Sequence, residues 1–211
     1  TVSVSHSEAI LPMIHQVVED QRFNLKELDA LAVGVGPGSF TGVRIGCATI
    51  KGLAQVLEKP ILPLSSLKAL ALSGAADLKN WPVAMLNAYQ GQVFVGWRSH
   101  DSQFCEEAMT AQSWCETYLK EFSKAAKVRF CGTGAELYWD QIVTAAQKQG
   151  VGLEPLELCA ETLYVSPEGL VRVVEHERQH SSLVHYLQLQ AYYMRPSEAE
   201  RKLDSKTGVA K

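Results

Sequence analysis

Apolar residues recur at helical spacing near the start of the chain. Between residues 6 and 19 they fall at three- and four-residue steps, which places them on one face of an amphipathic helix. Pro12 strains the early turns of this helix. The apolar positions are Ile10, Leu11, Ile14, Val17 and Val18.

Strands and helices then alternate. Residues 30–35 predict a short buried strand, which runs directly into the glycine-rich turn Gly36-Pro37-Gly38-Ser39. Ser39 is a typical helix N-cap, so a helix is predicted from Phe40 to about residue 58, followed by a strand at 60–64. Strand, crossover helix and strand form a right-handed unit of a parallel sheet, and the predicted fold class is therefore α/β.

The second half continues this pattern. Residues 83–88 and 92–98 flank a Gly-containing loop and predict a hairpin. Further helices are predicted over 65–76, 111–126, 135–149 and 166–178, with a strand at 128–131. The chain becomes more polar after Ser99, which we interpret as the crossing into a second lobe. We expect an N-terminal lobe over 1–100 and a C-terminal lobe over 101–211, whose tail can return to the first lobe.

Composition narrows the function. The 211 residues include 20 basic and 23 acidic side chains, and no basic run is interleaved with aromatic residues. This balance disfavours direct binding of nucleic acid by this chain alone. No apolar run is long enough to span a bilayer and no signal peptide is evident, so we expect a cytoplasmic protein without membrane contact. Five scattered cysteines, none in a Cys-x-x-Cys pair, indicate reduced thiols.

The glycine-rich turn is a candidate anion site. Backbone amides at a helix N-terminus can cradle a phosphate, and the residues placed to do so are Gly36, Gly38 and Ser39. The spacing matches neither a Walker A loop nor the Gly-x-Gly-x-x-Gly fingerprint. Nucleotide binding is therefore an expectation that no standard motif supports.

Gly42 and Gly46 are one helical turn apart and form a bare track on the second helix. Each glycine costs a helix about 1 kcal/mol relative to alanine, and close approach of another backbone usually offsets this cost. The neighbour can be part of the same fold or a partner subunit. The spacing alone favours the first and leaves the second open.

A resemblance to a known family bears on this choice. The stretch Gly36-Pro37-Gly38-Ser39-Phe40-Thr41-Gly42-Val43-Arg44-Ile45-Gly46 resembles the signature of the TsaB (YeaZ) family. Residues 6–14 resemble the first helix of that family, and residues 86–91 resemble its central hairpin. Ala191-Tyr192-Tyr193-Met194-Arg195 resembles its C-terminal Tyr-Leu-Arg segment. The resemblance is strongest over residues 30–72.

The resemblance implies an actin-like, sugar-kinase-like fold of two lobes with ribonuclease H topology. It implies a non-catalytic subunit of the machinery that forms N6-threonylcarbamoyladenosine at position 37 of tRNA. The implied partners are a second copy or the catalytic paralogue TsaD, the ATPase TsaE, and tRNA through the complex only. No cofactor is implied for this chain alone, and ATP or ADP is implied in the complex. The implied dimer interface comprises His6, Ile10, Ile14, Val17, Phe40, Gly42, Val43, Arg44, Gly46 and Ile50.

The chain departs from the family in two places. The family begins with a strand, an Asp-Thr turn and a hairpin, which are not found ahead of Thr1, so we expect an incomplete sheet in the first lobe. The catalytic paralogue also carries a His-x-x-x-His metal pair, where this chain has Ser66 and Leu70. These side chains cannot replace two imidazoles as metal ligands, so we expect a pseudo-enzyme without a metal.

Two alternatives stay open. The segment His176-Glu177-Arg178-Gln179-His180 fits the zincin order literally, and its two imidazoles share a helix face. Its hydrophilic neighbours indicate a solvated face, which leaves a glycoprotease-like metallopeptidase as a minor alternative. The glycine-rich turn motivates the other alternative, an independent actin-like ATPase or kinase. Arg44 can bind a phosphate or form a salt bridge across a helix interface.

Overall fold

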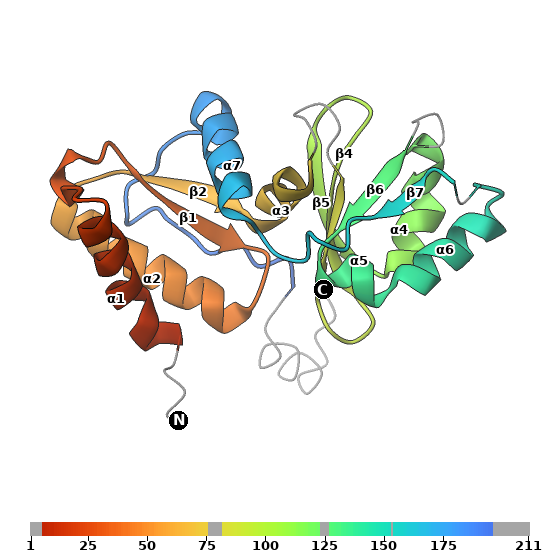
Figure 1. Ribbon diagram of the computed structural model, residues 1–211, viewed down its shortest axis with the longest axis horizontal. Helices are drawn as coiled ribbons and strands as arrows, with labels where there is room; N and C mark the ends of the chain where they lie inside the picture. Colours follow the sequence, from red (N-terminus) through yellow and green to blue (C-terminus); the bar gives the residue numbers. More distant parts are fainter. Residues whose placement is uncertain (1–5, 76–81, 123–126, 153, 196–211) are drawn as a thin grey trace, which may run out of the picture.

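Two sheets lie side by side along the long axis of the molecule (Figure 1). The computed structural model describes residues 6–75, 82–122, 127–152 and 154–195, with backbone only for 6–8. In the first sheet, β1 (Leu31–Gly36) pairs in parallel with β2 (Ile61–Ser65). The second sheet has the order β5-β4-β3-β6-β7. The predicted α/β class follows from both sheets.

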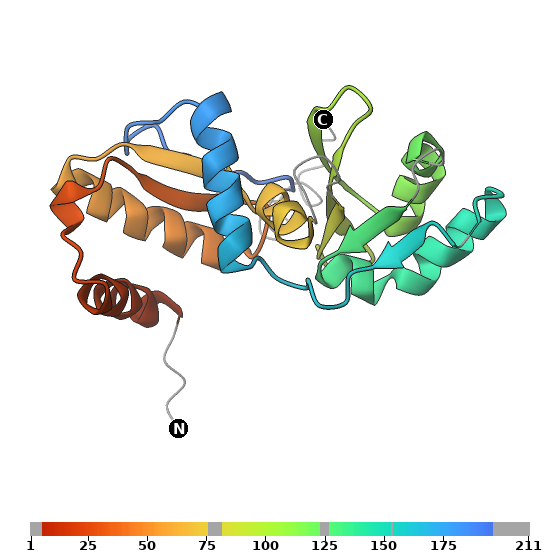
Figure 2. The same ribbon diagram turned by 45° about the horizontal axis from the view of Figure 1, so that its top comes forward.

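The first lobe is built on the predicted strand, helix and strand. Helix α2 (Phe40–Leu57) connects β1 to β2 and covers one face of their sheet. The hydroxyl of Ser39 accepts a hydrogen bond from the amide of Gly42 at 3.3 Å, which confirms the predicted N-cap. The helix ends at Glu58, whose left-handed φ of 53° is a common helix stop. Helix α1 (His6–Asp20) packs on the outer side of α2 (Figure 2), and a short 3-10 helix (Leu25–Glu27) follows it.

The second lobe packs three helices on a mixed sheet. Strands β3, β4 and β5 are antiparallel neighbours, whereas β3, β6 and β7 are parallel. In the core, the rings of Trp114 and Phe130 meet edge to face with centroids 5.7 Å apart. The elements are β3 (Val83–Asn87), β4 (Val93–Arg98), β5 (Phe104–Met109), α4 (Ala111–Tyr118), a 3-10 turn (Leu119–Phe122), β6 (Val128–Cys131), α5 (Thr133–Leu137), α6 (Trp139–Lys148) and β7 (Leu156–Leu158).

Helix α3 (Ser66–Gly74) lies between the two sheets and packs on both. Leu67, Leu70 and Ala71 join the apolar cluster that includes strands β3 and β6 of the second sheet. Ala69 and Leu72 join the cluster that includes β2 and helix α7 (Pro167–His180). These five side chains are almost fully buried, so α3 is the apolar joint between the lobes.

Lys68 is the charged exception on this buried helix. Its ammonium lies 2.5 Å from the carboxylate of Glu177 on α7, and the two side chains are 19% and 9% exposed. Ser181 also donates a hydrogen bond to Glu177. Across the joint, Ser65 donates a hydrogen bond to Glu106 on β5. A polar cluster thus connects α3 to α7 and to the second sheet.

Burial affects the two carboxylates differently. Burial raises the pKa of Glu106, and the hydrogen bond from Ser65 and the charge of Lys68 offset this only in part. Burial also opposes ionisation of Glu177, but the hydrogen bonds from Lys68 and Ser181 outweigh it, so the pKa of Glu177 is lowered. Glu177 is therefore the stable anion of the cluster.

The structure differs from the sequence-based expectations in three places. Residues 104–109 form strand β5, which the sequence analysis did not predict. The second sheet already begins at Val83, ahead of the expected lobe boundary at residue 100, because β3 and β4 hydrogen-bond within it. The helix predicted over 135–149 is two helices that meet at Tyr138. Residues 123–126 of a predicted helix and the part of the expected C-terminal lobe from residue 196 onward lie outside the described residues.

All five cysteines are unpaired; four are buried and Cys105 is partly buried. Burial raises the pKa of the Cys115 thiol to about 12. Among the described residues, no helix combines the length and hydrophobicity needed to cross a membrane.

We predict that Lys68→Met lowers the free energy of unfolding by about 3 kcal/mol, because Glu177 is then buried without its cation. Urea unfolding of the single variants and of Lys68→Met/Glu177→Leu measures this. The double variant should regain most of the loss. A double variant that loses the sum of the single effects would contradict the pairing.

We predict that Glu106→Gln stabilises the protein increasingly as pH rises. Since the pKa of Glu106 is raised, its contribution to stability is fully present below the ordinary value of 4.5 and is lost as pH rises through the higher folded-state pKa. Glutamine still accepts the hydrogen bond from Ser65 but does not ionise. Unfolding free energies of both proteins between pH 4.5 and neutrality provide the test, and a pH-independent difference would refute the assignment.

Candidate functional site

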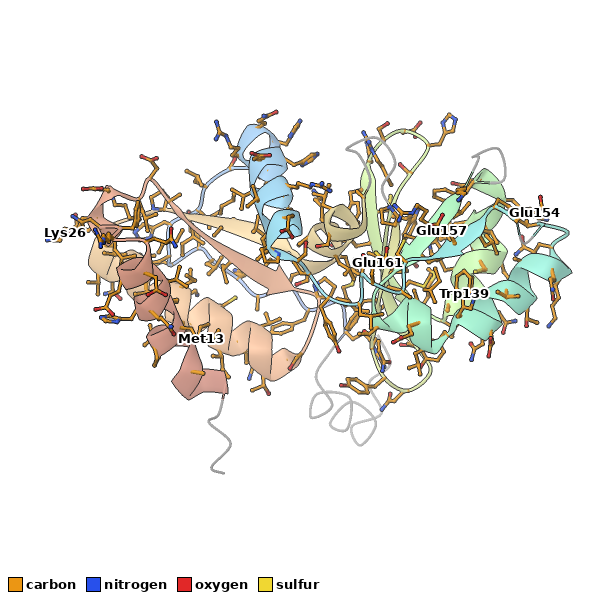
Figure 3. All side chains as sticks on the ribbon, in the orientation of Figure 1. Met13, Lys26, Trp139, Glu154, Glu157 and Glu161 are labelled. Carbon is orange, nitrogen blue, oxygen red and sulfur yellow. The ribbon has the colours of Figure 1, made fainter. Side chains whose placement is uncertain are left out.

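The apolar face of α1 is wider than the surface that α2 covers. At roughly 100° per residue, the six apolar side chains between residues 10 and 18 occupy an arc of about 160°. Ile10 and Ile14, at its centre, are partly buried, as is Val18. The margins are uncovered, since Leu11, Met13 and Val17 are 52%, 63% and 62% exposed (Met13 is labelled in Figure 3).

The outer face of α2 carries a row of small or apolar side chains, with the exposed polar residues Arg44 and Gln55 beside it. Thr41, Ala48, Gly52 and Val56 are exposed and follow one another at helical spacing, and Val56 is 82% exposed. A methyl group placed on Gly52 would meet nothing within 4 Å. We define the docking face as these four residues together with Leu11, Met13 and Val17 of α1. Of these seven residues, the sequence analysis assigned only Val17 to the interface. The spacing of small and apolar residues at positions 48, 52 and 56 is nevertheless visible in the sequence.

The predicted interface residues of α2 divide between two faces. Val43 and Ile50 pack against the core of their own chain. Gly46 is partly buried, and a methyl group there would lie 3.8 Å from Val33 of β1, an ordinary contact. Gly42 is exposed, and a methyl group there would contact only its own cap, Ser39. The side chain of His6, the first residue of α1, lies outside the described residues.

Phe40 and Arg44 form a cluster with Tyr193, a residue of the segment that follows α7. The guanidinium of Arg44 lies 3.8 Å from the centroid of the Phe40 ring. Its Nε donates a hydrogen bond to the hydroxyl of Tyr193 at 3.1 Å, and the rings of Phe40 and Tyr193 are 4.9 Å apart. Arg44 and Tyr193 remain exposed, so this cluster extends the docking face toward the start of α2. Sequence reasoning did not place Tyr193 here.

The glycine-rich turn serves the chain's own structure. Gly36 has a left-handed φ of 119°, and a methyl group there would approach the carbonyl oxygen of Tyr192 to 2.5 Å. The hydroxyl of Ser39 caps α2, and Gly38 is exposed. The close approach of Tyr192 thus accounts for Gly36 without a phosphate. Nucleotide binding by these residues stays a prediction.

In the zincin-like segment, the carboxylate of Glu177 is bound by side chains of its own chain. The rings of His176 and His180 stack 4.5 Å apart on α7. Glu177, which a zincin would use as general base, is held instead by Lys68 and Ser181. The described ranges contain no cluster of three or more His, Cys, Asp or Glu arranged to hold a metal ion. This geometry gives the peptidase alternative no support.

Leu70, which the resemblance aligns with the paralogue's second metal ligand, is fully buried in the apolar joint of α3. Ser66 is the first residue of that helix. The docking face, by contrast, carries surface without catalytic groups: it can bind another apolar surface by excluding water, and its small residues allow backbones to approach closely.

Comparisons with known proteins agree with this description. The family model for TsaD, tRNA N6-adenosine threonylcarbamoyltransferase, matches residues 1–133. The tRNA threonylcarbamoyladenosine biosynthesis protein TsaB of Haemophilus influenzae is 46% identical over 67 residues, covering 32% of this chain and 28% of that protein. TsaB of Bacillus subtilis is 33% identical over 143 residues, covering 65% of this chain and 61% of that protein. The alignments thus span less than two thirds of these curated relatives.

A solved structure of YeaZ from Pseudomonas aeruginosa superposes with a TM-score of 0.69 at 25% identity, covering 92% of this chain and 88% of that chain. This likeness confirms the predicted actin-like, two-lobed α/β fold. Since the family model covers more than half of the chain, the chain belongs to the tRNA N6-adenosine threonylcarbamoyltransferase family and, within it, to the TsaB (YeaZ) proteins.

Proposed function

We propose that this protein is a non-catalytic subunit of the cytoplasmic machinery that forms N6-threonylcarbamoyladenosine at position 37 of tRNA. It takes part by binding another subunit through the docking face. The observation that carries the proposal is apolar surface left uncovered by the chain itself, above all Met13, Val17 and Val56. Large apolar side chains grouped on two adjacent helices are typical of an interface.

The partner we propose is the catalytic TsaD-like subunit, with a second copy of this chain taking its place in isolation. The matching family model is named for the threonylcarbamoyltransferase itself, so this chain and that enzyme share a family. Related folds can present corresponding helices to each other around an approximate two-fold axis. A TsaE-like ATPase then joins the complex, and tRNA is contacted through the complex, consistent with the formal charge of −3 on this chain.

The absence of catalysis by this chain is part of the proposal. Leu70 and Ser66 stand at the paralogue's metal positions, and an aliphatic side chain offers no ligand atom. The rival function, an independent ATPase or kinase, finds less support, because Gly36 and Ser39 already have structural partners.

We predict that Ala48→Leu weakens association at the docking face by roughly tenfold, about 1.4 kcal/mol. The larger leucine side chain would prevent the partner from approaching α2 closely. Gln147→Leu adds the same side chain to the exposed face of α6 and serves as the control. Light scattering after size exclusion measures self-association, and binding to the TsaD-like subunit is measured in parallel.

The same variants test the function in a reconstituted reaction. Modification of adenosine 37 should require this chain, fall with Ala48→Leu and be unaffected by Gln147→Leu. Full modification without this chain would contradict the proposal, and ATP turnover by the isolated chain would favour the rival.

We predict opposite effects of Gly52→Ala on folding and on binding. Alanine should stabilise the isolated chain by up to about 1 kcal/mol, since helix propensity improves and nothing in the chain lies near the added methyl group. The same methyl group should weaken association, because it prevents close approach of the partner. Urea unfolding at low concentration and a dissociation constant measure the two effects. Unchanged or tighter association would exclude Gly52 from the interface.

A further inference from the structure

After α7 the chain returns across the first lobe. Val184 and Ile61 exchange backbone hydrogen bonds of 2.8 and 2.9 Å, which attaches the returning segment beside β2. Leu189 is 2% exposed and packs with Cys47 and Ala54 of α2. Figure 1 shows this segment running back along the first sheet toward the centre of the molecule. The return path is therefore a packed part of the first lobe.

Residues 192 and 193 attach this segment to β1 and α2. The amide of Tyr192 donates a hydrogen bond to the carbonyl oxygen of Val35 at 2.7 Å. The next residue, Tyr193, contacts Arg44 and Phe40 on the surface of α2. A ligand that binds Arg44 and Phe40 would therefore lie next to the end of the returning segment.

Residues 194 and 195 attach the same segment to the second lobe. Met194 packs against the cluster that α3 forms with β3 and β6. The guanidinium of Arg195 donates hydrogen bonds to the carbonyl oxygen of Ala88 at 3.0 Å and to the side-chain oxygen of Gln90 at 3.3 Å. Ala88 and Gln90 belong to the tip of the hairpin between β3 and β4. Only Met194 therefore lies between the residue that contacts α2 and the residue that contacts the hairpin tip of the other lobe.

The hairpin tip is strained. Tyr89 and Gln90 have left-handed φ values of 60° and 56°, and Gly91 follows with 76°. For residues other than glycine this conformation costs about 1 kcal/mol or more each, and surrounding structure must hold it. Tyr89 is 75% exposed, so packing of its side chain does little to hold the tip. The contacts that help to hold it include the hydrogen bonds from Arg195, the one from the amide of Tyr89 to Asn87, and the backbone hydrogen bonds that link Gln92 to Ala88 and to Tyr89.

We propose that residues 192–195 form a conformational relay between the two lobes. The contact of Tyr193 with α2 and the contact of Arg195 with the hairpin tip form as one unit, so a ligand that engages Arg44 and Phe40 sets the conformation of the tip. The use of this relay by a partner subunit rests on the proposed function. The coupling itself belongs to the isolated chain.

A double-mutant cycle in the isolated chain tests the coupling. Arg44→Ala removes the contact of α2 with Tyr193, and Arg195→Ala removes the contact of the returning segment with the hairpin tip. If the relay is one unit, the double variant changes the unfolding equilibrium constant at least about threefold less than the product of the single fold-changes. The control pairs Arg195→Ala with Gln55→Ala, an exposed residue of α2 with no described contact to the relay, and its fold-changes should multiply.

Hydrogen exchange locates the effect. Tyr193→Phe removes the hydroxyl that accepts the hydrogen bond from Arg44 and keeps the ring on Phe40. Amides of residues 88–92 should then exchange several-fold faster. Tyr164→Phe, at a tyrosine that is 74% exposed, should leave them unchanged. The relay is wrong if the fold-changes of Arg44→Ala and Arg195→Ala in the unfolding equilibrium constant simply multiply in the double variant. It is also wrong if Tyr193→Phe leaves the exchange rates of the amides of residues 88–92 unchanged. Both measurements use a low protein concentration at which the chain is monomeric, so this result is independent of whether the docking face binds a partner.

Discussion

The two-sided packing of α3 is the constraint on which the rest of the structure depends. Leu67 and Leu70 bury one face against the second sheet, and Leu72 buries the other against the first lobe. Separating the lobes would uncover one face of α3, at a cost of about 2 kcal/mol for each leucine exposed. Separation on the side of α7 would also break the Lys68–Glu177 pair. The joint therefore orients α2 and α1 away from the second lobe, where their outer faces are open.

The inner face of α2 is sufficient for folding, so its outer face can serve another purpose. Cys47 and Ala54 are buried against the sheet, whereas Gly52 and Val56 contribute little to the fold. A glycine in the middle of a helix without a close neighbour makes the chain less stable than alanine would at the same position. Such a position is expected where a second subunit approaches, and this is the physical basis of the docking proposal.

Much of the first lobe could be predicted from sequence because its signals are local. The Ser39 cap, the alternation of strand and helix and the apolar stripe of α1 each involve residues close in the chain. Strand β5 was missed because Glu106 is polar, and its partner Ser65 is 41 residues away. The contact between Arg44 and Tyr193, 149 residues apart, has no local signature at all. The sequence therefore predicted which helices are exposed better than it predicted which of their residues are.

Hydrogen exchange of the α1 and α2 amides, followed as the wild-type chain is concentrated and then mixed with the TsaD-like subunit, tests the docking face most directly. The account predicts slower exchange across both helices as the complex forms, with exchange across α6 unchanged. Equal exchange at every concentration and with the partner present would show that this face binds neither, and would contradict the central claim.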